Sequence, residues 1–174
     1  MPVYVALIRA INVGDTRTIP IAELKALARD IGLKTVSAPL QSANLVFRDD
    51  WEPDEIAAML DTVLGLRLGR APGVFIRTPQ ELAQILTDNP FPAGIPARVQ
   101  VNFFQSRLPD SALNGICALD GEEAVVRGRE IFVHYPLGFG RSDLKLPILE
   151  RGTARNLKTV TKLTEVAQAL EAAG

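Results

Sequence analysis

The order of hydrophobic periodicities in the first 77 residues restricts the fold of this chain more than any other feature. Residues 3–10, apart from Arg9, are apolar on both alternating faces, which is typical of a strand in the middle of a covered sheet. The patterns that follow are helical, strand, strand, helical and strand, at 21–31, 35–37, 43–48, 53–64 and 74–77. The resulting βαββαβ order predicts a ferredoxin-like α/β plait.

Local start and stop signals support the predicted helices. Pro53 opens the second helical pattern, and Gly65 is expected to close it. Beyond the last strand, Thr78 and Glu81 form a capping box with Pro79 at the first helical position. This combination predicts a third helix.

The second half of the chain repeats part of this order. The stretch 89–96 holds three prolines and a glycine, so it is predicted to be a stiff connector. A strand, a short helix, a hairpin turning at Gly128 and two helices are expected after it, at 99–104, 110–117, 124–126 with 131–135, 142–150 and 156–173. The sequence therefore predicts an α+β protein of two ferredoxin-like, βαββαβ-type halves packed in one body, over 1–88 and 97–174.

Composition and charge narrow the classes of function. Apolar residues make up 47% of the chain, which is typical of a globular protein. Basic and acidic residues number 19 and 20, whereas a protein held to nucleic acid by bulk attraction is usually basic. No apolar stretch approaches the roughly 20 residues of a membrane span, and the N-terminus lacks signal-peptide features. A cytoplasmic location without a membrane partner is expected, and nucleic acid is disfavoured as a partner.

The single cysteine, Cys117, lies in the apolar run 116–119 and cannot form a disulfide within its own chain. This fits a reducing compartment, and we expect the thiol to be buried, reduced and unreactive. One cysteine and one histidine exclude a zinc site built from those ligands, and no acidic cluster suggests magnesium. No metal is expected, and no cofactor is assigned.

Five polar residues are expected to meet at one edge of the first sheet. In a ferredoxin-like unit the first and third strands are adjacent and antiparallel, so the end of one lies beside the start of the other. This topology gathers Arg9, Asn12, Gln41, Ser42 and Asn44. Converging polar groups where apolar strands end can bind a ligand. With equal weight, they can cap turns, bond to the backbone or pair with carboxylates.

A glycine-rich segment, 134–142, leaves a predicted strand. Gly138 and Gly140 can turn backbone amides toward an anion, with Arg141 beside them. The lysine and hydroxyl residue that end a P-loop are absent. A tight turn explains the same glycines and is favoured, and His134 is interpreted as a sheet residue rather than a catalyst.

The segment before the last helix is basic. Asn156 is a predicted N-cap, and Arg155, Lys158 and Lys162 stand where the helix dipole would favour acidic residues. From 141 to 162 there are six basic and two acidic residues, a local charge of +4. This pattern favours an anion site over a solvated helix face.

Four segments resemble those of a known family: RAINVG (9–14), QSANLVF (41–47), YPLGFGRS (135–142) and RNLKTVTKL (155–163). On these segments the chain is similar, over essentially its whole length, to the bacterial proteins grouped as domain of unknown function 1697 (DUF1697). The resemblance implies a ferredoxin-like fold of two plaits. It implies no catalytic residue, substrate or cofactor, because the family is uncharacterised. All four segments coincide with the polar clusters above, which strengthens the interpretation of a binding site.

Two functional hypotheses follow. In the first, the protein binds a phosphorylated or otherwise anionic small molecule at a cationic site between the halves, built from Arg9, Asn12, Gln41, Ser42, Asn44, Arg141, Arg155, Asn156 and Lys162. In the second, it is a nucleic-acid or protein interaction module, although the RNA-binding signature of ferredoxin-like sheets is missing. No nucleophile–base pair or carboxylate pair can be named, so the sequence assigns no enzymatic activity.

Overall fold

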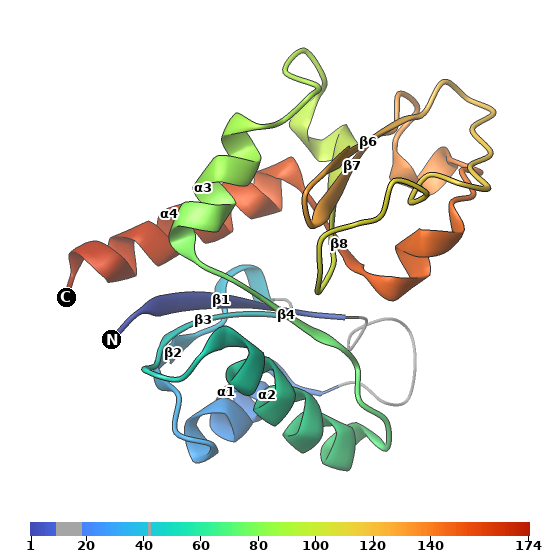
Figure 1. Cartoon of the computed structure of the whole chain (residues 1–174). Coiled ribbons are helices and arrows are strands. Elements are labelled where there is room, and N and C mark those ends of the chain that lie inside the picture. Colours follow the sequence, from blue (N-terminus) through green and yellow to red (C-terminus); the bar gives the residue numbers. More distant parts are fainter. Residues whose placement is uncertain (10–18, 42) are drawn as a thin grey trace. The chain divides into compact units, whose positions relative to one another are not determined.

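Residues 1–9, 19–41 and 43–174 are described by a computed structural model of the chain (Figure 1). Grouped by their internal contacts they form two compact units: unit 1 comprises Met1–Ala83 with Lys162–Gly174, and unit 2 comprises Gln84–Thr161. Each unit contains one antiparallel four-stranded sheet. The predicted division of the chain into two halves, 1–88 and 97–174, remains a prediction.

Unit 1 has the predicted βαββαβ order. Its elements are β1 (Val3–Ile8), α1 (Ile21–Asp30), β2 (Lys34–Ser37), the 3₁₀ turn η1 (Pro39–Gln41), β3 (Asn44–Arg48), α2 (Pro53–Leu68) and β4 (Val74–Arg77). The strands lie in the order β2-β3-β1-β4, and each neighbouring pair is antiparallel. The first and third strands are therefore neighbours, as predicted for a ferredoxin-like sheet.

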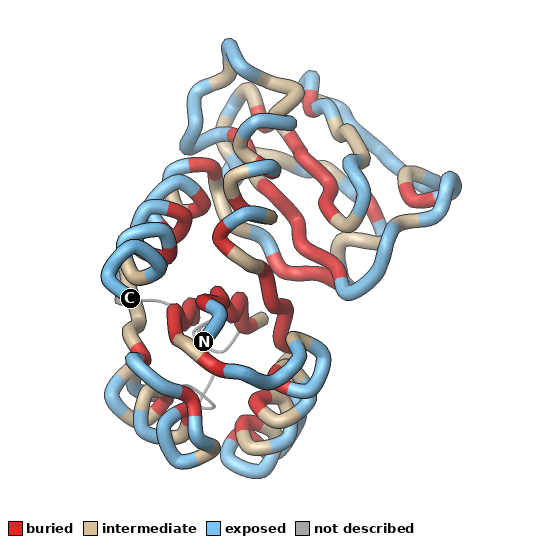
Figure 2. The backbone as a smooth tube through the Cα atoms, turned by 60° about the vertical axis from the view of Figure 1, so that its left-hand side comes forward, coloured by how far each residue is buried: buried red, intermediate tan, exposed pale blue. Residues whose placement is uncertain are grey.

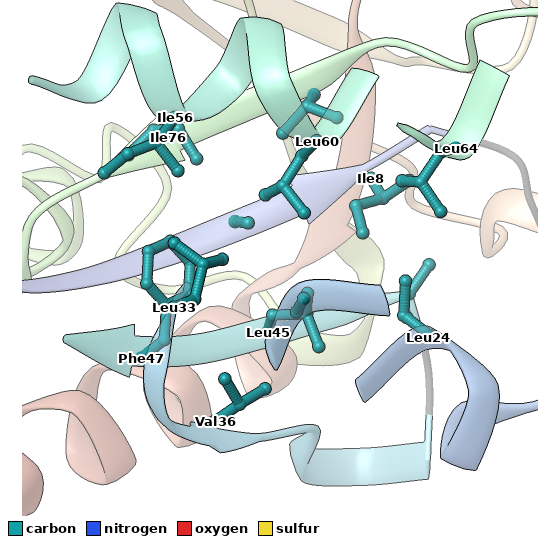
Figure 3. Close-up of a cluster of buried hydrophobic side chains, with 14 of the residues drawn as sticks. Ile8, Leu24, Leu33, Val36, Leu45, Phe47, Ile56, Leu60, Leu64 and Ile76 are labelled. Carbon is teal, nitrogen blue, oxygen red and sulfur yellow. The ribbon is translucent and has the colours of Figure 1, made fainter. Parts of the chain in front are cut away.

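The core of unit 1 lies between the sheet and helices α1 and α2, which cover the same face (Figures 1 and 3). Leu24 of α1 and Leu60 and Leu64 of α2 pack against the sheet residues Ile8 and Leu45, and all five are fully buried. Burial of one such side chain contributes about 1.5–3 kcal/mol. These leucines therefore hold both helices to the sheet.

The central strand is covered on both of its faces. All six residues of β1 are buried, which confirms the inference from its apolar pattern (Figure 2).

On the C-terminal helix α4 (Leu157–Ala172), the Leu170 carbonyl accepts a hydrogen bond from the Arg48 guanidinium of β3. The Gln80 side chain, on α3 (Pro79–Thr87), donates to the Glu171 carboxylate at 2.8 Å. These contacts hold the last turn of α4 to the rest of unit 1.

The predicted capping box opens α3. The Thr78 amide donates to a Glu81 carboxylate oxygen at 2.8 Å, and the Glu81 amide donates to the Thr78 hydroxyl at 3.1 Å. Two amides that have no intrahelical partner are satisfied in this way.

Helix α2 continues beyond the residue at which we expected it to end. Gly65 lies inside the helix, where an added Cβ would stand 3.2 Å from the backbone nitrogen of Ala71. The helix ends at Gly69 instead, whose φ of 85° lies in the left-handed region that glycine adopts at low cost. Gly65 therefore allows a close approach of the following chain, and Gly69 supplies the C-cap.

Unit 2 repeats the strand order of unit 1. Its strands are β5 (Val99–Phe103), β6 (Glu123–Arg127), β7 (Glu130–His134) and β8 (Thr153–Asn156). They lie in the order β6-β7-β5-β8, all antiparallel, so the second, third, first and fourth strands are neighbours in both sheets. The predicted hairpin joins β6 to β7, and Gly128 has a φ of 60° in its turn. The fold class is thereby confirmed.

Two helices that we predicted in unit 2 are absent as α-helices. Residues 110–115 form turns, because so short a run is unstable as an isolated helix and Gly115 has a φ of 79°. In place of a helix over 142–150 there are two 3₁₀ turns, η3 (Phe139–Arg141) and η4 (Pro147–Arg151). The chain between them is held extended by a bridge in which Cys117 and Lys145 exchange backbone hydrogen bonds of 2.8 and 3.0 Å.

The sequence analysis missed β8. Its four residues pair with β5 in the register Val101↔Arg155. Three of the four are polar or charged, and two of these, Thr153 and Arg155, lie on the same face. A short polar strand has no apolar alternation to reveal it. The last helix accordingly begins at Leu157.

The prediction that Cys117 is buried is wrong. The cysteine is free and exposed, as are Ile116 and Leu119 of the same apolar run. Residues paired across an antiparallel bridge project to the same side. Cys117 therefore shares the side of exposed Lys145, away from the cluster that contains Leu146.

Exposure predicts that a thiol reagent such as dithionitrobenzoate labels Cys117 rapidly and completely in the native protein, without denaturant. Labelling is followed by the release of the coloured thiolate. Slow labelling at the rate of global unfolding would contradict this placement.

A close approach in unit 2 yields a prediction about stability. A Cβ at Gly152 would stand 2.5 Å from the carbonyl oxygen of Phe103 and 3.0 Å from the ring of Phe104. We predict that Gly152→Ala lowers the free energy of unfolding by about 1–3 kcal/mol, measured by urea denaturation, because the sheet must shift. Gly140→Ala is the control, since a Cβ there meets nothing within 4 Å. Equal losses in the two variants would refute the steric explanation.

Candidate functional site

The predicted polar edge of unit 1 is in place for the residues that the structure describes. Leu7 of β1 pairs with Asn44 of β3, and the Ile8 amide donates to the Ala43 carbonyl at 2.9 Å. Directly after β1, the Arg9 amide donates to the Gly73 carbonyl at 3.0 Å. Asn44 is fully buried, whereas Arg9 is half-buried. The end of the first strand therefore lies beside the start of the third, as topology requires.

Three members of this cluster stay predictions. Asn12 and Ser42 lie outside the described residues, and so does the side chain of Gln41. Only Arg9 and Asn44 are placed by the structure.

The glycine-rich segment is a tight turn with structural contacts. Tyr135 is buried, and its ring meets Phe139 edge-on at a centroid distance of 5.3 Å. Gly138 has a φ of 86°, which favours glycine. The Ser142 hydroxyl donates to a Glu122 carboxylate oxygen at 2.6 Å, and this hydrogen bond lowers the pKa of Glu122. These contacts support the turn interpretation for the segment and leave Arg141 exposed.

The basic segment contains one arginine whose side chain is held in place. On β8, Nη1 of Arg155 donates to the Thr153 hydroxyl at 2.7 Å and to the Ala154 carbonyl at 2.8 Å. The side chain is half-buried, and burial lowers the pKa of Arg155 to about 10. Lys158 and Lys162 are exposed on α4.

Asn156 is the N-cap of α4, as predicted. Its Oδ1 accepts a hydrogen bond of 2.9 Å from the Thr159 amide, three residues along. The helix start is thereby fixed directly after the strand that carries Arg155.

The expectation of one shared site stays a prediction. Arg9, Asn44 and Lys162 belong to unit 1, whereas Arg141, Arg155 and Asn156 belong to unit 2. Within unit 2, Asn156 pairs with Gln100, and the neighbouring Val99 pairs with His134, so the ends of β7 and β8 flank the start of β5.

A cleft in unit 2 was missed by the sequence analysis. It has a volume of about 470 Å³ and is lined by residues of the proline-rich stretch and of the end of β7: Pro90, Phe91, Pro92, Ala93, Gly94, Ile95, Arg98, His134 and Pro136. The sequence predicts only a connector at 89–96. The signal that could have indicated a site is a stiff apolar stretch followed at once by an arginine.

Two negative findings apply to the described part of the chain. No helix there is long and apolar enough to cross a bilayer. Nor do three or more histidine, cysteine or carboxylate side chains come together there as metal ligands.

The fold defines an α+β protein of two ferredoxin-like sheets. The chain belongs to the family described as "Protein of unknown function (DUF1697)", which matches residues 1–132. The resemblance inferred from the sequence is confirmed, although segments 135–142 and 155–163 lie beyond the matched residues.

A solved structure, described as that of "conserved bacterial protein SP0830 from Streptococcus pneumoniae", is similar with a TM-score of 0.75. The two chains are 18% identical, and the likeness covers 95% of this chain and 98% of the other. At this identity the likeness concerns the fold alone. No curated protein matches the chain.

The buried tyrosine next to the glycine-rich turn predicts a pH dependence. Burial, with a smaller contribution from the Glu122 charge, raises the pKa of Tyr135 to about 12. An unfolded tyrosine loses its proton near pH 10, so between about pH 10 and 12 only the folded state keeps it. The free energy of unfolding should therefore fall as the pH rises through this window.

Urea unfolding at several alkaline pH values checks this effect, with Tyr135→Phe as the comparison because phenylalanine has no proton to lose. The slope of stability against pH should be smaller in Tyr135→Phe. Identical slopes in the two proteins would show that Tyr135 does not cause the effect.

Proposed function

We propose that this protein binds a phosphorylated or otherwise anionic small molecule through the basic segment 141–162. The observation that carries this proposal is the position of Arg155, whose half-buried guanidinium is oriented by Thr153 and Ala154. A guanidinium with a fixed direction loses less side-chain freedom when it binds a phosphate or carboxylate.

Electrostatics support the same assignment. Desolvation lowers the pKa of Arg155 only to about 10, so its guanidinium is positively charged at neutral pH and attracts an anion. The segment has six basic and two acidic residues, and Arg141, Arg151 and Lys158 are exposed. Repulsion among these cations is relieved by a bound anion.

The experiment uses inorganic phosphate, pyrophosphate and glucose 6-phosphate in a thermal-shift series, followed by calorimetric titration of whichever raises the melting temperature. A ligand that binds only the native state stabilises it in proportion to its affinity. We expect Arg155→Gln to lose about 1.5–3 kcal/mol of binding free energy, the contribution of a hydrogen bond to a charged group.

Arg151→Gln is the matched control, because Arg151 is an exposed arginine of the same segment. It should change the affinity by much less than Arg155→Gln. Arg155→Lys keeps the charge and tests whether the oriented fork matters. The proposal is wrong if no anion shifts the melting temperature, or if the two glutamine variants bind equally well.

The nucleic-acid alternative is weakened by the described strands. Ferredoxin-like RNA-binding sheets stack bases on exposed aromatic rings. Here the aromatic residues of the strands are all buried: Tyr4, Phe47, Phe75, Phe103 and Phe132. Among the described strands, only the half-buried imidazole of His134 at the end of β7 offers a ring that is not buried.

A protein interaction module is the second candidate, and exposed apolar side chains in unit 2 favour it. Leu119 is 72% exposed and Phe139 is 60% exposed, on loops that the Ser142–Glu122 hydrogen bond joins. Sedimentation velocity over a concentration series tests self-association, and the double variant Leu119→Gln, Phe139→Gln should reduce it. A chain that stays monomeric at all concentrations would remove support for self-association.

A further inference from the structure

We propose that the proline-rich cleft of unit 2 is a binding site for a small aromatic carboxylate. This inference does not rest on the anion site at Arg155, because the lining residues, the arginine and the ligand class are different.

The size of the cleft fits a small molecule. Its volume of about 470 Å³ lies in the range of ligand pockets, roughly 300–1,000 Å³. The walls are mainly apolar, formed by prolines together with Phe91 and Ile95. Ile95 is 55% exposed, so its apolar surface is available to a ligand.

The walls are already organised by hydrogen bonds within unit 2. Oδ1 of Asn89 accepts from the Phe91 amide at 2.9 Å, and the Phe91 carbonyl accepts from the Gly94 amide at 3.0 Å. The Tyr135 amide donates to the Arg98 carbonyl at 2.8 Å, which joins the loop to the end of β7. A loop fixed in this way, with prolines that restrict its backbone, loses little entropy when a ligand binds.

One wall presents flat rings. The imidazole of His134 stacks on Phe91 with a centroid distance of 5.5 Å and an interplanar angle of 28°. Aromatic ligands pack on such a pair by offset stacking or edge-to-face contact. The cleft therefore favours a planar aromatic body.

The positive charge of Arg98 favours an aromatic ligand that carries an acidic group. Arg98 is exposed, and its Nη1 donates to the Pro136 carbonyl at 2.6 Å, which orients the guanidinium at the cleft. A guanidinium has further N–H donors that can bind a carboxylate with two parallel hydrogen bonds. The described lining contains no acidic side chain to compete for Arg98. Charge complementarity thus favours a carboxylate over a neutral ligand.

The chain's single histidine makes the test direct. His134 gives the only imidazole Cε1–H resonance in the NMR spectrum, and it lies in the cleft wall. The probes are 2-naphthoate and its neutral counterpart, 2-naphthamide, titrated into the full chain. We expect 2-naphthoate to shift the His134 resonance saturably by its ring current and to bind at least tenfold more tightly than 2-naphthamide.

Arg98→Gln should reduce the affinity for 2-naphthoate at least tenfold, the loss of a charge-assisted contact. Arg127→Gln is the matched control, because Arg127 is also exposed and also donates through Nη1 to a backbone carbonyl, that of Val126 at 3.1 Å. It should bind like the parent. The amide spectrum of each variant confirms that it is folded.

Any one of the following outcomes would overturn the proposal. The first is that 2-naphthoate leaves the His134 resonance unshifted. The second is that the amide binds as tightly as the acid, or that Arg98→Gln and Arg127→Gln bind equally. The third is that the resonance shifts with protein concentration alone, which would assign the cleft to a second copy of the chain.

Discussion

Burial of both faces of β1 is the constraint on which the rest of unit 1 depends. A strand without a solvated face must lie in the middle of a sheet, and antiparallel pairing then gives it β3 and β4 as neighbours. In the observed register Leu7 of β1 pairs with Asn44 of β3. The polar residues that follow these strands are positioned as a consequence, so Arg9 lies at the edge where Asn44 begins the neighbouring strand.

The sequence correctly predicted the elements that an apolar pattern or a helix cap determines. The pattern of 74–77 coincides with β4, Thr78 and Glu81 form their capping box, and Asn156 caps α4. Each of these features depends on neighbours within a few residues in the chain. Local physical chemistry therefore suffices to predict them.

Features that depend on distant contacts could not be predicted in the same way. Strand β8 is short and polar and is defined by its pairing with β5. Cys117 is exposed because a bridge to Lys145 turns its run outward, although the run itself is apolar. The cleft arises because 90–95 lies against the end of β7, a contact that no spacing in the sequence indicates. Of the candidate site, the cap formed by Asn156 followed from the local sequence and the position of Arg9 followed from sheet topology, whereas the orientation of Arg155 required the structure.

The central claim is that the basic segment 141–162 binds an anion. An amide NMR titration of the full chain with pyrophosphate at physiological ionic strength tests this claim most directly. If the basic segment binds anions, saturable shifts should concentrate at the amides from Thr153 to Thr159, around the oriented guanidinium of Arg155. Shifts scattered over exposed lysines and arginines, growing linearly without saturation, would mean that only a diffuse ion atmosphere responds. That result would contradict the proposed anion site.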